Sequence, residues 1–266
     1  VKDALQAAAT HEQILRRIEA IPGVTSVGLA SSMPMEGMNS NDPVWVEDKP
    51  GPEGQMPPVR RYKWVTPNFF GTVGTPLVAG RDFTWDDLHN LQPVVVISDS
   101  LAREYFGSAA GALGRRIRNS PKNPWREVVG IVADVRDDGV TRGEVPTVYW
   151  PMAMKDYWDQ ETFVQRWMSY AIRTPRVRTA GFINDVQQAV WSVNPNLPLA
   201  RPRTLAAIYD ESMAETSFAL VIIAIAGGVT LAVGVHQRSW ALGAGLLLFV
   251  SVVLDCCDGQ LARARK

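Results

Sequence analysis

The residues best suited to chemistry lie near the C-terminal end of the 266-residue chain. Asp255 and Asp258 stand three positions apart, Gly259 follows the second, and Ala262 and Arg263 complete the run. Two carboxylates at i and i+3 face the same side of a helix and can share a divalent cation such as Mg²⁺ or Mn²⁺. The glycine permits close approach of a ligand, and the arginine fork suits phosphate. The alternative is a helix end whose acids and bases are merely solvated.

This run resembles the first half of the CDP-alcohol phosphatidyltransferase motif, Asp-x-x-Asp-Gly-x-x-Ala-Arg, and the resemblance covers about residues 219–266. It implies that Asp255 and Asp258 are metal ligands and that Gly259, Ala262 and Arg263 line the CDP-alcohol site. The second half of the motif does not occur before the last residue printed. We therefore expect no complete catalytic site and no turnover by this chain.

The segment that carries the motif has the composition of a membrane anchor. Residues 216–235 contain no charged side chain, and a helix of that length rises about 30 Å, which is the thickness of a bilayer's hydrocarbon core. A second uncharged run, 239–254, follows after a three-residue polar break. We expect a two-helix transmembrane hairpin in residues 216–266 and contact with membrane lipid. A buried hairpin in a soluble core is the alternative.

Composition separates this tail from residues 1–215. The whole chain has 27 basic and 27 acidic residues, and this zero net charge argues against a nucleic-acid-binding protein. A hydrophobic content of 46% and two cysteines exclude a disordered chain and a disulfide scaffold. The two cysteines, Cys256 and Cys257, are adjacent and cannot readily form a relaxed disulfide. Residues 1–215 contain no cysteine and are therefore compatible with an oxidising compartment.

Residues 1–215 offer little that resembles a catalytic site. His11 and His89 lie neither beside a cysteine nor four positions from another ligand, so we expect solvated histidines and no zinc site. The chain has no Gly-x-Ser-x-Gly elbow and no glycine loop ending in Gly-Lys-Ser/Thr. Residues 134–139 superficially resemble a calcium loop, but arginine and valine at the third and twelfth ligand positions favour an ordinary Asx-rich turn. We expect a non-catalytic binding or force-transmitting domain without a cofactor.

Hydrophobic periodicity and turn residues predict interleaved helices and strands in this part, and hence an α+β fold with split βαβ elements. Residues 33–58 are predicted to be a long loop, and Thr66 is predicted to cap a helix with Pro67 in its first turn. Serine or aspartate is predicted to cap the helix at 98–106. Predicted helices span 4–20, 98–106 and 179–193, and predicted strands span 24–30, 59–65, 94–97, 127–135 and 169–173.

Four blocks of residues 1–215 resemble, in order, the MacB-like periplasmic core domain of FtsX-type ABC transporter permeases. The blocks are IPGVTSVGLASSMPMEG (21–37), VTPNFFGTVGTPLVAGRDF (65–83), VVVISDSLAREYF (94–106) and REVVGIVADVR (126–136). The resemblance implies an extracytoplasmic, non-catalytic domain in a bacterial inner (cytoplasmic) membrane protein. It also implies a cytoplasmic ABC ATPase subunit and a second permease copy as partners, with ATP hydrolysis coupled to export or other extracytoplasmic events.

The two resemblances conflict in topology. A permease helix that follows an external domain runs inward and would place the Asp255 motif outside, whereas phosphatidyltransferases present it on the cytoplasmic side. Because the chain also lacks an initiator methionine, we expect a fused or fragmentary product with its junction near residues 212–220. The predicted domains are therefore 1–215 and 216–266. A membrane-tethered interaction module without a transport role is a further alternative.

Overall fold

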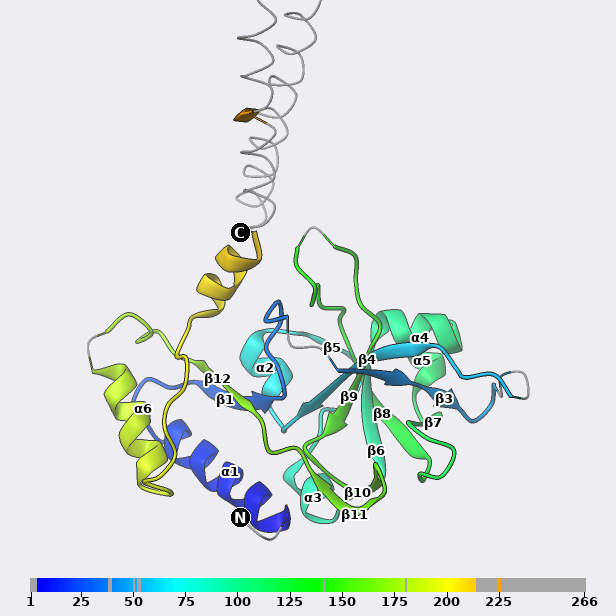
Figure 1. The fold of residues 1–266 in the computed structure, drawn as a ribbon, viewed down its shortest axis with the longest axis horizontal. Helices are drawn as coiled ribbons and strands as arrows, with labels where there is room; N and C mark the ends of the chain where they lie inside the picture. The colour runs from blue at the N-terminus through cyan, green and yellow to red at the C-terminus, as the bar shows by residue number, and fades with distance from the viewer. Residues whose placement is uncertain are drawn as a thin grey trace, which may run out of the picture. The chain divides into compact units, whose positions relative to one another are not determined.

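The computed structural model describes residues 4–37, 40–49, 51, 54–140, 142–179, 181–213 and 224–225. The chain divides into two units, Val1–Leu205 and Ala206–Lys266. The first unit carries the sheet and helices that are labelled in Figure 1. The predicted boundary between residues 215 and 216 lies outside the described residues and stays a prediction.

Within the described residues, ten strands form one mixed sheet. Its order is β12–β1–β4–β9–β6–β8–β7–β3, with β2 paired to β4 and β5 paired to β8. The pairs β4–β9 and β6–β8 are parallel, and the other pairs are antiparallel. A separate antiparallel hairpin joins β10 to β11. The strands are β1 Ser26–Ala30, β2 Ser40–Pro43, β3 Trp45–Val46, β4 Val59–Val65, β5 Leu77–Gly80, β6 Val94–Ser98, β7 Arg116–Arg118, β8 Arg126–Val132, β9 Thr147–Pro151, β10 Ala153–Tyr157, β11 Gln160–Val164 and β12 Ser169–Arg173.

The helices pack on two regions of this sheet and beside the β10–β11 hairpin (Figure 1). Near β12 and β1, α1 packs against α6, β1 and β11, while α2 packs against β1 and β12. Over the middle of the sheet, α4 packs against β6, β8 and β9, and α5 packs against α4, β5 and β8. The short helix α3 lies against the β10–β11 hairpin. The helices are α1 Ala4–Glu19, α2 Phe69–Val73, α3 Trp85–His89, α4 Asp99–Phe106, α5 Ala109–Ala112 and α6 Phe182–Trp191.

The α+β class is confirmed, but neither parallel pair is split by an intervening strand, since β4 pairs directly with β9 and β6 with β8. Strands β6 and β8 are joined through α4, α5 and β7 and pair directly with each other. The expected loop at 33–58 is also partly wrong, because it contains the short strands β2 and β3. These strands are brief and their sequence is rich in turn residues, so their pairing with β4 and β7 decides their conformation.

Local capping confirms one predicted helix start and corrects another. Ser98 caps α4, because its side chain accepts a hydrogen bond from the Leu101 amide. The predicted cap at Thr66 is wrong. Helix α2 begins at Phe69, after Asn68 in the left-handed conformation, and the Thr66 hydroxyl instead accepts the Leu29 amide of β1 at 2.9 Å. Thr66 therefore fastens two strands rather than opening a helix.

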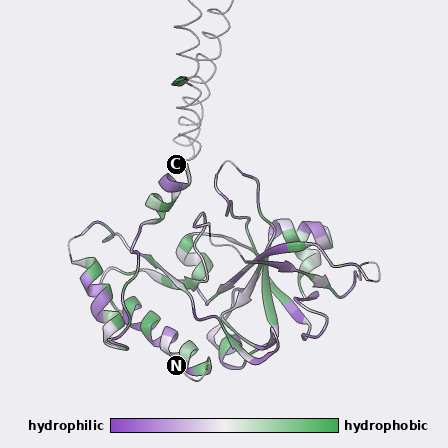
Figure 2. Cartoon of the chain, in the orientation of Figure 1, coloured by the Kyte–Doolittle hydropathy of each residue, from purple (hydrophilic) through white to green (hydrophobic). Residues whose placement is uncertain are grey.

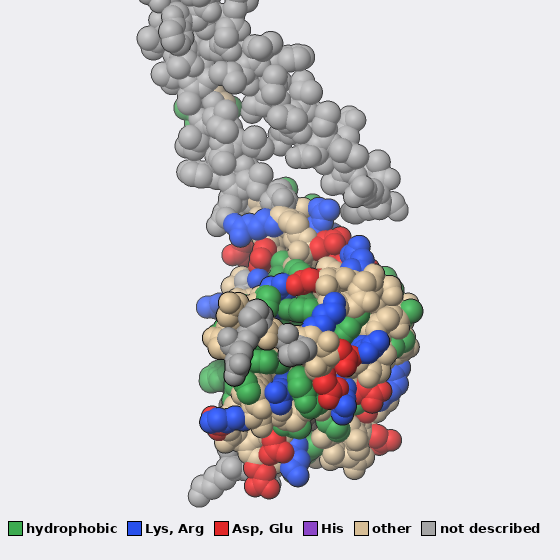
Figure 3. Space-filling model, turned by 90° about the vertical axis from the view of Figure 1, so that its right-hand side faces the viewer, with side chains coloured by type: hydrophobic (Ala, Val, Ile, Leu, Met, Phe, Trp, Pro, Cys, Tyr) green, Lys and Arg blue, Asp and Glu red, His purple; other side chains and the backbone are tan. Residues whose placement is uncertain are grey.

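The core lies where aromatic side chains of the central strands meet. Tyr62 and Trp150 pack edge to face with ring centroids 5.2 Å apart, and Trp64 and Tyr157 pack likewise at 6.1 Å. Figure 2 shows hydrophobic colour along β6 and mixed colours on α1 and α6, as expected for helices with one buried face. The face in Figure 3 mixes acidic and basic side chains with hydrophobic ones between them.

The predicted transmembrane hairpin falls almost entirely outside the described residues, of which only 224–225 lie within it. Across the described ranges, no helix combines the length and the apolar character needed to span a bilayer. The hairpin therefore stays a prediction.

Candidate functional site

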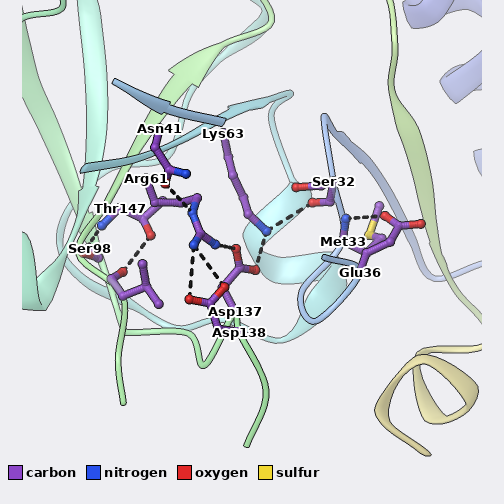
Figure 4. Close-up of polar contacts among 11 residues, drawn as sticks. Ser32, Met33, Glu36, Asn41, Arg61, Lys63, Ser98, Asp137, Asp138 and Thr147 are labelled. Atoms are coloured by element: carbon purple, nitrogen blue, oxygen red, sulfur yellow. Dashed lines mark hydrogen bonds and ion pairs between the residues drawn. The ribbon is translucent and has the colours of Figure 1, made fainter. Parts of the chain in front are cut away.

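A buried ionic cluster lies in the part of the chain that the structure describes. It consists of Arg61, Lys63, Asp137 and Asp138. The Asp137 carboxylate accepts from Arg61 Nη1 at 2.6 Å and from Lys63 Nζ at 2.5 Å. Arg61 Nη2 also lies 3.0 Å from Asp138 Oδ1. The Arg61, Lys63 and Asp137 side chains are 6%, 3% and 3% exposed. Figure 4 shows both cations converging on Asp137.

The alternation of β4 places the two cations. Residues i and i+2 of a strand share a face, so Arg61 and Lys63 lie on one side of β4 while Tyr62 and Trp64 enter the aromatic core on the other. Strand β4 pairs with β1, β2 and β9, and both of its faces are covered. Because a buried charge is costly without a partner, this strand requires carboxylates from elsewhere in the fold.

The carboxylates come from the turn that follows β8. Asp134 at the start of this turn accepts the Ser100 amide at 2.8 Å and Arg103 Nη2 at 2.8 Å, which ties the turn to α4. Asp137 and Asp138 then reach back to β4. The turn is thus held at both ends by charge-assisted hydrogen bonds, which are stronger than neutral ones.

Polar groups around the cluster extend it toward neighbouring loops. Asn41 Oδ1 of β2 accepts from Arg61 Nε at 3.0 Å, and the Ser32 carbonyl accepts from Lys63 Nζ at 3.3 Å. The Met35 amide donates to the Asp137 carbonyl at 3.0 Å. The cluster therefore joins β4 and β2, the loop 31–37 and the turn 133–140.

Burial determines the electrostatics of the cluster. Removal from water lowers the pKa of Lys63, and the charge and hydrogen bond of Asp137 act in the opposite direction. Two cations and two carboxylates balance within the cluster, and the Asp137 carboxylate is occupied by both cations. This arrangement holds segments together; it does not present a nucleophile or a general base to a substrate.

The residues that the sequence singled out for metal and CDP-alcohol binding are not among those that the structure describes. Asp255 and Asp258, predicted as Mg²⁺ or Mn²⁺ ligands, fall outside the described residues, as do Gly259, Ala262 and Arg263 of the predicted CDP-alcohol site. Among the residues that are described, no group of three or more His, Cys, Asp or Glu side chains is placed to hold a metal ion.

The histidines depart in part from the prediction that they are solvated. His11 is half-buried, with Nδ1 2.7 Å from the Tyr170 hydroxyl, and burial lowers its pKa. His89 is more exposed, stacks on Trp85 and lies 2.7 Å from Glu12 Oε2. Both histidines therefore make contacts between elements of the fold.

A shallow pocket of about 380 Å³ lies where the start of α1 meets β11. Trp167 at its rim is 83% exposed, and Arg166 stands beside it. The remaining lining residues are Ala4, Gln160, Phe163, Val164 and Gln165. The pocket is separate from the buried ionic cluster.

Sequence reasoning missed the cluster, although its signal was present. The alternation of β4 identified the strand, because Arg61 and Lys63 alternate with Tyr62 and Trp64. A charged face usually indicates a face exposed to water, but it also fits a central strand whose cations are paired. The acidic segment 134–139 is predicted as an ordinary Asx-rich turn, and this prediction assigns no partner to its carboxylates. Two cations on a central strand, together with an acidic turn of opposite charge far away in the sequence, form the pattern that would have predicted the cluster.

Comparison with known proteins is consistent with this fold. The family described as MacB-like periplasmic core domain matches residues 4–189. This match identifies residues 4–189 as an extracytoplasmic domain of the type found in MacB- and FtsX-type ABC transporter permeases. The chain belongs to the MacB-like periplasmic core domain family. A search of curated proteins found no match.

Three solved structures resemble the chain at low identity. The periplasmic region of MacB from Actinobacillus actinomycetemcomitans is 16% identical, with a TM-score of 0.44, over 68% of this chain and 72% of that one. The extracellular domain of the noncanonic ABC-type transporter YknZ from Gram-positive bacteria is 15% identical, with a TM-score of 0.44, over 70% and 82%. A domain described as belonging to a permease protein from Porphyromonas gingivalis is 18% identical, with a TM-score of 0.42, over 69% of each chain. None of these comparisons points to a CDP-alcohol phosphatidyltransferase segment.

Proposed function

We propose that this chain is the extracytoplasmic, non-catalytic part of an ABC transporter permease in a bacterial inner membrane. The observation that carries the proposal is the family match over residues 4–189. In this role the domain would couple ATP hydrolysis by a separate cytoplasmic subunit to export or to another event outside the membrane. A second permease copy and membrane lipid complete the proposed surroundings.

The chemistry of the described residues supports a structural role. The buried side chains of Arg61 and Lys63 both form ion pairs with Asp137. Such a cluster fixes the relative positions of β4 and two loops. A domain that transmits motion requires rigid connections of this kind, whereas a catalytic side chain must be accessible to its substrate. The proposal therefore needs no cofactor in residues 1–215.

Co-purification with an ATPase tests this proposal. The full natural protein, tagged and extracted from its own host in mild detergent, should bring down a nucleotide-binding ABC subunit. ATP hydrolysis by that complex should vanish when the subunit's phosphate-binding lysine is replaced. If the cells express the ABC subunit but the purified permease does not contain it, the proposal is contradicted.

The tail carries a separate proposal that rests on its motif alone. We propose that Asp255 and Asp258 bind Mg²⁺ or Mn²⁺ and that Gly259, Ala262 and Arg263 face a CDP-alcohol, as one half of a phosphatidyltransferase site. Calorimetric titration of the full chain with MnCl₂ should show binding that Asp255→Asn abolishes. The chain should release no CMP from a CDP-alcohol, with or without metal. Robust metal-dependent release would favour the enzyme over the permease domain.

A further inference from the structure

The last stretch of the first unit is fastened to the rest of that unit by an ion pair. Arg203 lies two residues before Leu205, the last residue of the unit, and its Nη2 donates to Glu36 Oε1 at 2.9 Å. Residues 197–204 have no regular secondary structure, so no strand ladder holds them. Side-chain contacts must therefore position this exit segment, which we define as residues 197–205.

Glu36 connects the exit segment to its own loop. One carboxylate oxygen, Oε1, accepts from Arg203, and the other, Oε2, accepts the Met33 amide at 2.9 Å. The Glu36 amide in turn donates to the Met33 carbonyl at 3.3 Å. The Glu36 side chain is 17% exposed, so its contacts are only partly screened by water. One carboxylate thus orders the loop 31–37 and holds the exit segment.

The same loop contacts the buried ionic cluster at two points. The Ser32 carbonyl accepts from Lys63, and the Met35 amide donates to the carbonyl of Asp137. Figure 4 shows Glu36, Met33 and Ser32 on one side of the cluster, with Lys63 between them and Asp137. Hydrogen bonds and the short backbone segment 32–36 together therefore connect Arg203 to Asp137.

Backbone strain marks the exit segment independently. Arg201, two residues before Arg203, has φ of 51°, in the left-handed region that non-glycine residues rarely adopt. Such a conformation persists only where its surroundings hold it in place, and it tends to occur at functional sites. The strain and the ion pair lie within three consecutive residues of the chain.

We propose that the Glu36–Arg203 ion pair is a coupling contact, through which the position of the exit segment controls the order of the loop 31–37 and of the turn 133–140. Arg203 and Glu36 are positioning residues in this scheme. The exit segment continues covalently into residues 206–266, so a displacement of that part of the chain reaches the cluster through this contact. The coupling role rests on the proposed function, whereas the connection between the ion pair and the cluster does not.

Hydrogen exchange on the full chain tests the connection. Arg203→Gln removes the ion pair to Glu36 while the bond from the Met33 amide to Glu36 Oε2 can stay. We expect exchange to become about two- to fivefold faster at the Met35 amide and at the amides of Asp137 and Gly139. Glu36→Gln combined with Arg203→Gln should have no larger effect on Asp137 and Gly139 than Arg203→Gln alone. The glutamine introduced at position 36 keeps an oxygen that can accept the Met33 amide, so both changes remove the same ion pair.

A matched control comes from another ion pair of the first unit. Arg176 and Asp185 lie 2.7 Å apart with side chains 31% and 45% exposed, and neither contacts the cluster. Asp185→Asn should leave exchange at Met35 and Asp137 unchanged. The charge-reversed pair Glu36→Arg with Arg203→Glu restores the attraction between the two side chains but not the Met33 bond. It should therefore return both the Met35 and the Asp137 amides only part of the way toward their parent exchange rates.

Two results would overturn the inference. In the first, Arg203→Gln speeds exchange in the loop 31–37 but leaves Asp137 and Gly139 unchanged, so that the series of contacts ends at the loop. In the second, the Glu36 and Arg203 variants act additively on the turn. ATP hydrolysis by the complex with its ATPase is measured separately. If the exchange effects appear but no such complex exists, the proposed function fails while the connection stands.

Discussion

Lys63 Nζ lies 2.5 Å from Asp137 Oδ1, although the two residues are 74 positions apart in the chain. Both side chains are almost completely removed from solvent, and Arg61 contacts the second oxygen of the same carboxylate. The pair joins a central strand to the turn after β8, so the position of that turn depends on a charge rather than on a strand ladder.

Asp137→Asn should destabilise the domain by about 3–5 kcal/mol, because it leaves Arg61 and Lys63 buried without their shared carboxylate. The free energy of unfolding in urea, followed by tryptophan fluorescence of the full chain, measures the loss. Asp48→Asn is the matched control, since Asp48 and its partner Arg115 are 51% and 52% exposed. It should change stability by less than about 1 kcal/mol. Equal losses in the two variants would show that burial is irrelevant to this cluster.

Ser98→Ala should cost about 2–3 kcal/mol, which is more than an ordinary helix cap contributes. The Ser98 hydroxyl accepts from the Leu101 amide at the start of α4 and from the Thr147 amide of β9, and the residue is fully buried. Removal leaves a buried donor in a strand as well as an uncapped helix. Ser108→Ala removes only the exposed cap of α5 and should cost about 1 kcal/mol or less. Urea unfolding of both variants decides the comparison.

Gly28→Ala should reduce stability by about 1–3 kcal/mol through overpacking. A Cβ at this position of β1 would lie 2.5 Å from Phe69 Cα, and the backbone of α2 cannot yield as a flexible side chain would. Gly71→Ala provides the control within α2 itself, where a Cβ meets nothing within 4 Å. This second change should be neutral or stabilising, since alanine favours a helix. Thermal unfolding of both variants tests the difference, and a tolerated Gly28→Ala would contradict the close packing.

The Arg81–Asp87 pair predicts a specific loss of stability in acid. Burial raises the pKa of Asp87, but hydrogen bonds from Arg81 and Thr84 outweigh it and hold the pKa below its ordinary value of 3.8. Because the folded protein binds this proton more weakly, the stabilisation is present above pH 3.8 and disappears as the pH falls through the lower, folded value.

Unfolding free energies of the parent and Asp87→Asn, measured between pH 2 and pH 6, test this point. The difference between them should be largest near pH 6 and should shrink below about pH 4. Asp86→Asn changes the neighbouring exposed carboxylate of α3 and serves as the control. A difference that stays constant down to pH 2 would contradict the assignment.

Much of the secondary structure was predictable because its signals are local. The apolar stripe of α1, the alternation of β4 and the Ser98 cap of α4 depend on residues within a few positions of one another. The four blocks between residues 21 and 136 likewise identified the family that the match over 4–189 shows. Short strands such as β2 and β3 were not predictable, because only their partners β4 and β7 stabilise them.

The sequence by itself therefore determined the α+β class, the main helices and strands, the family and the neutral charge of the chain. It also contains the Asp255–Arg263 motif, whose role stays a prediction. Tertiary structure alone decided which charges meet. Arg61 and Lys63 find Asp137 across more than seventy residues, and Glu36 finds Arg203 across 167. The physical reason is that a buried charge must be paired, but its local sequence does not specify which distant turn supplies the partner.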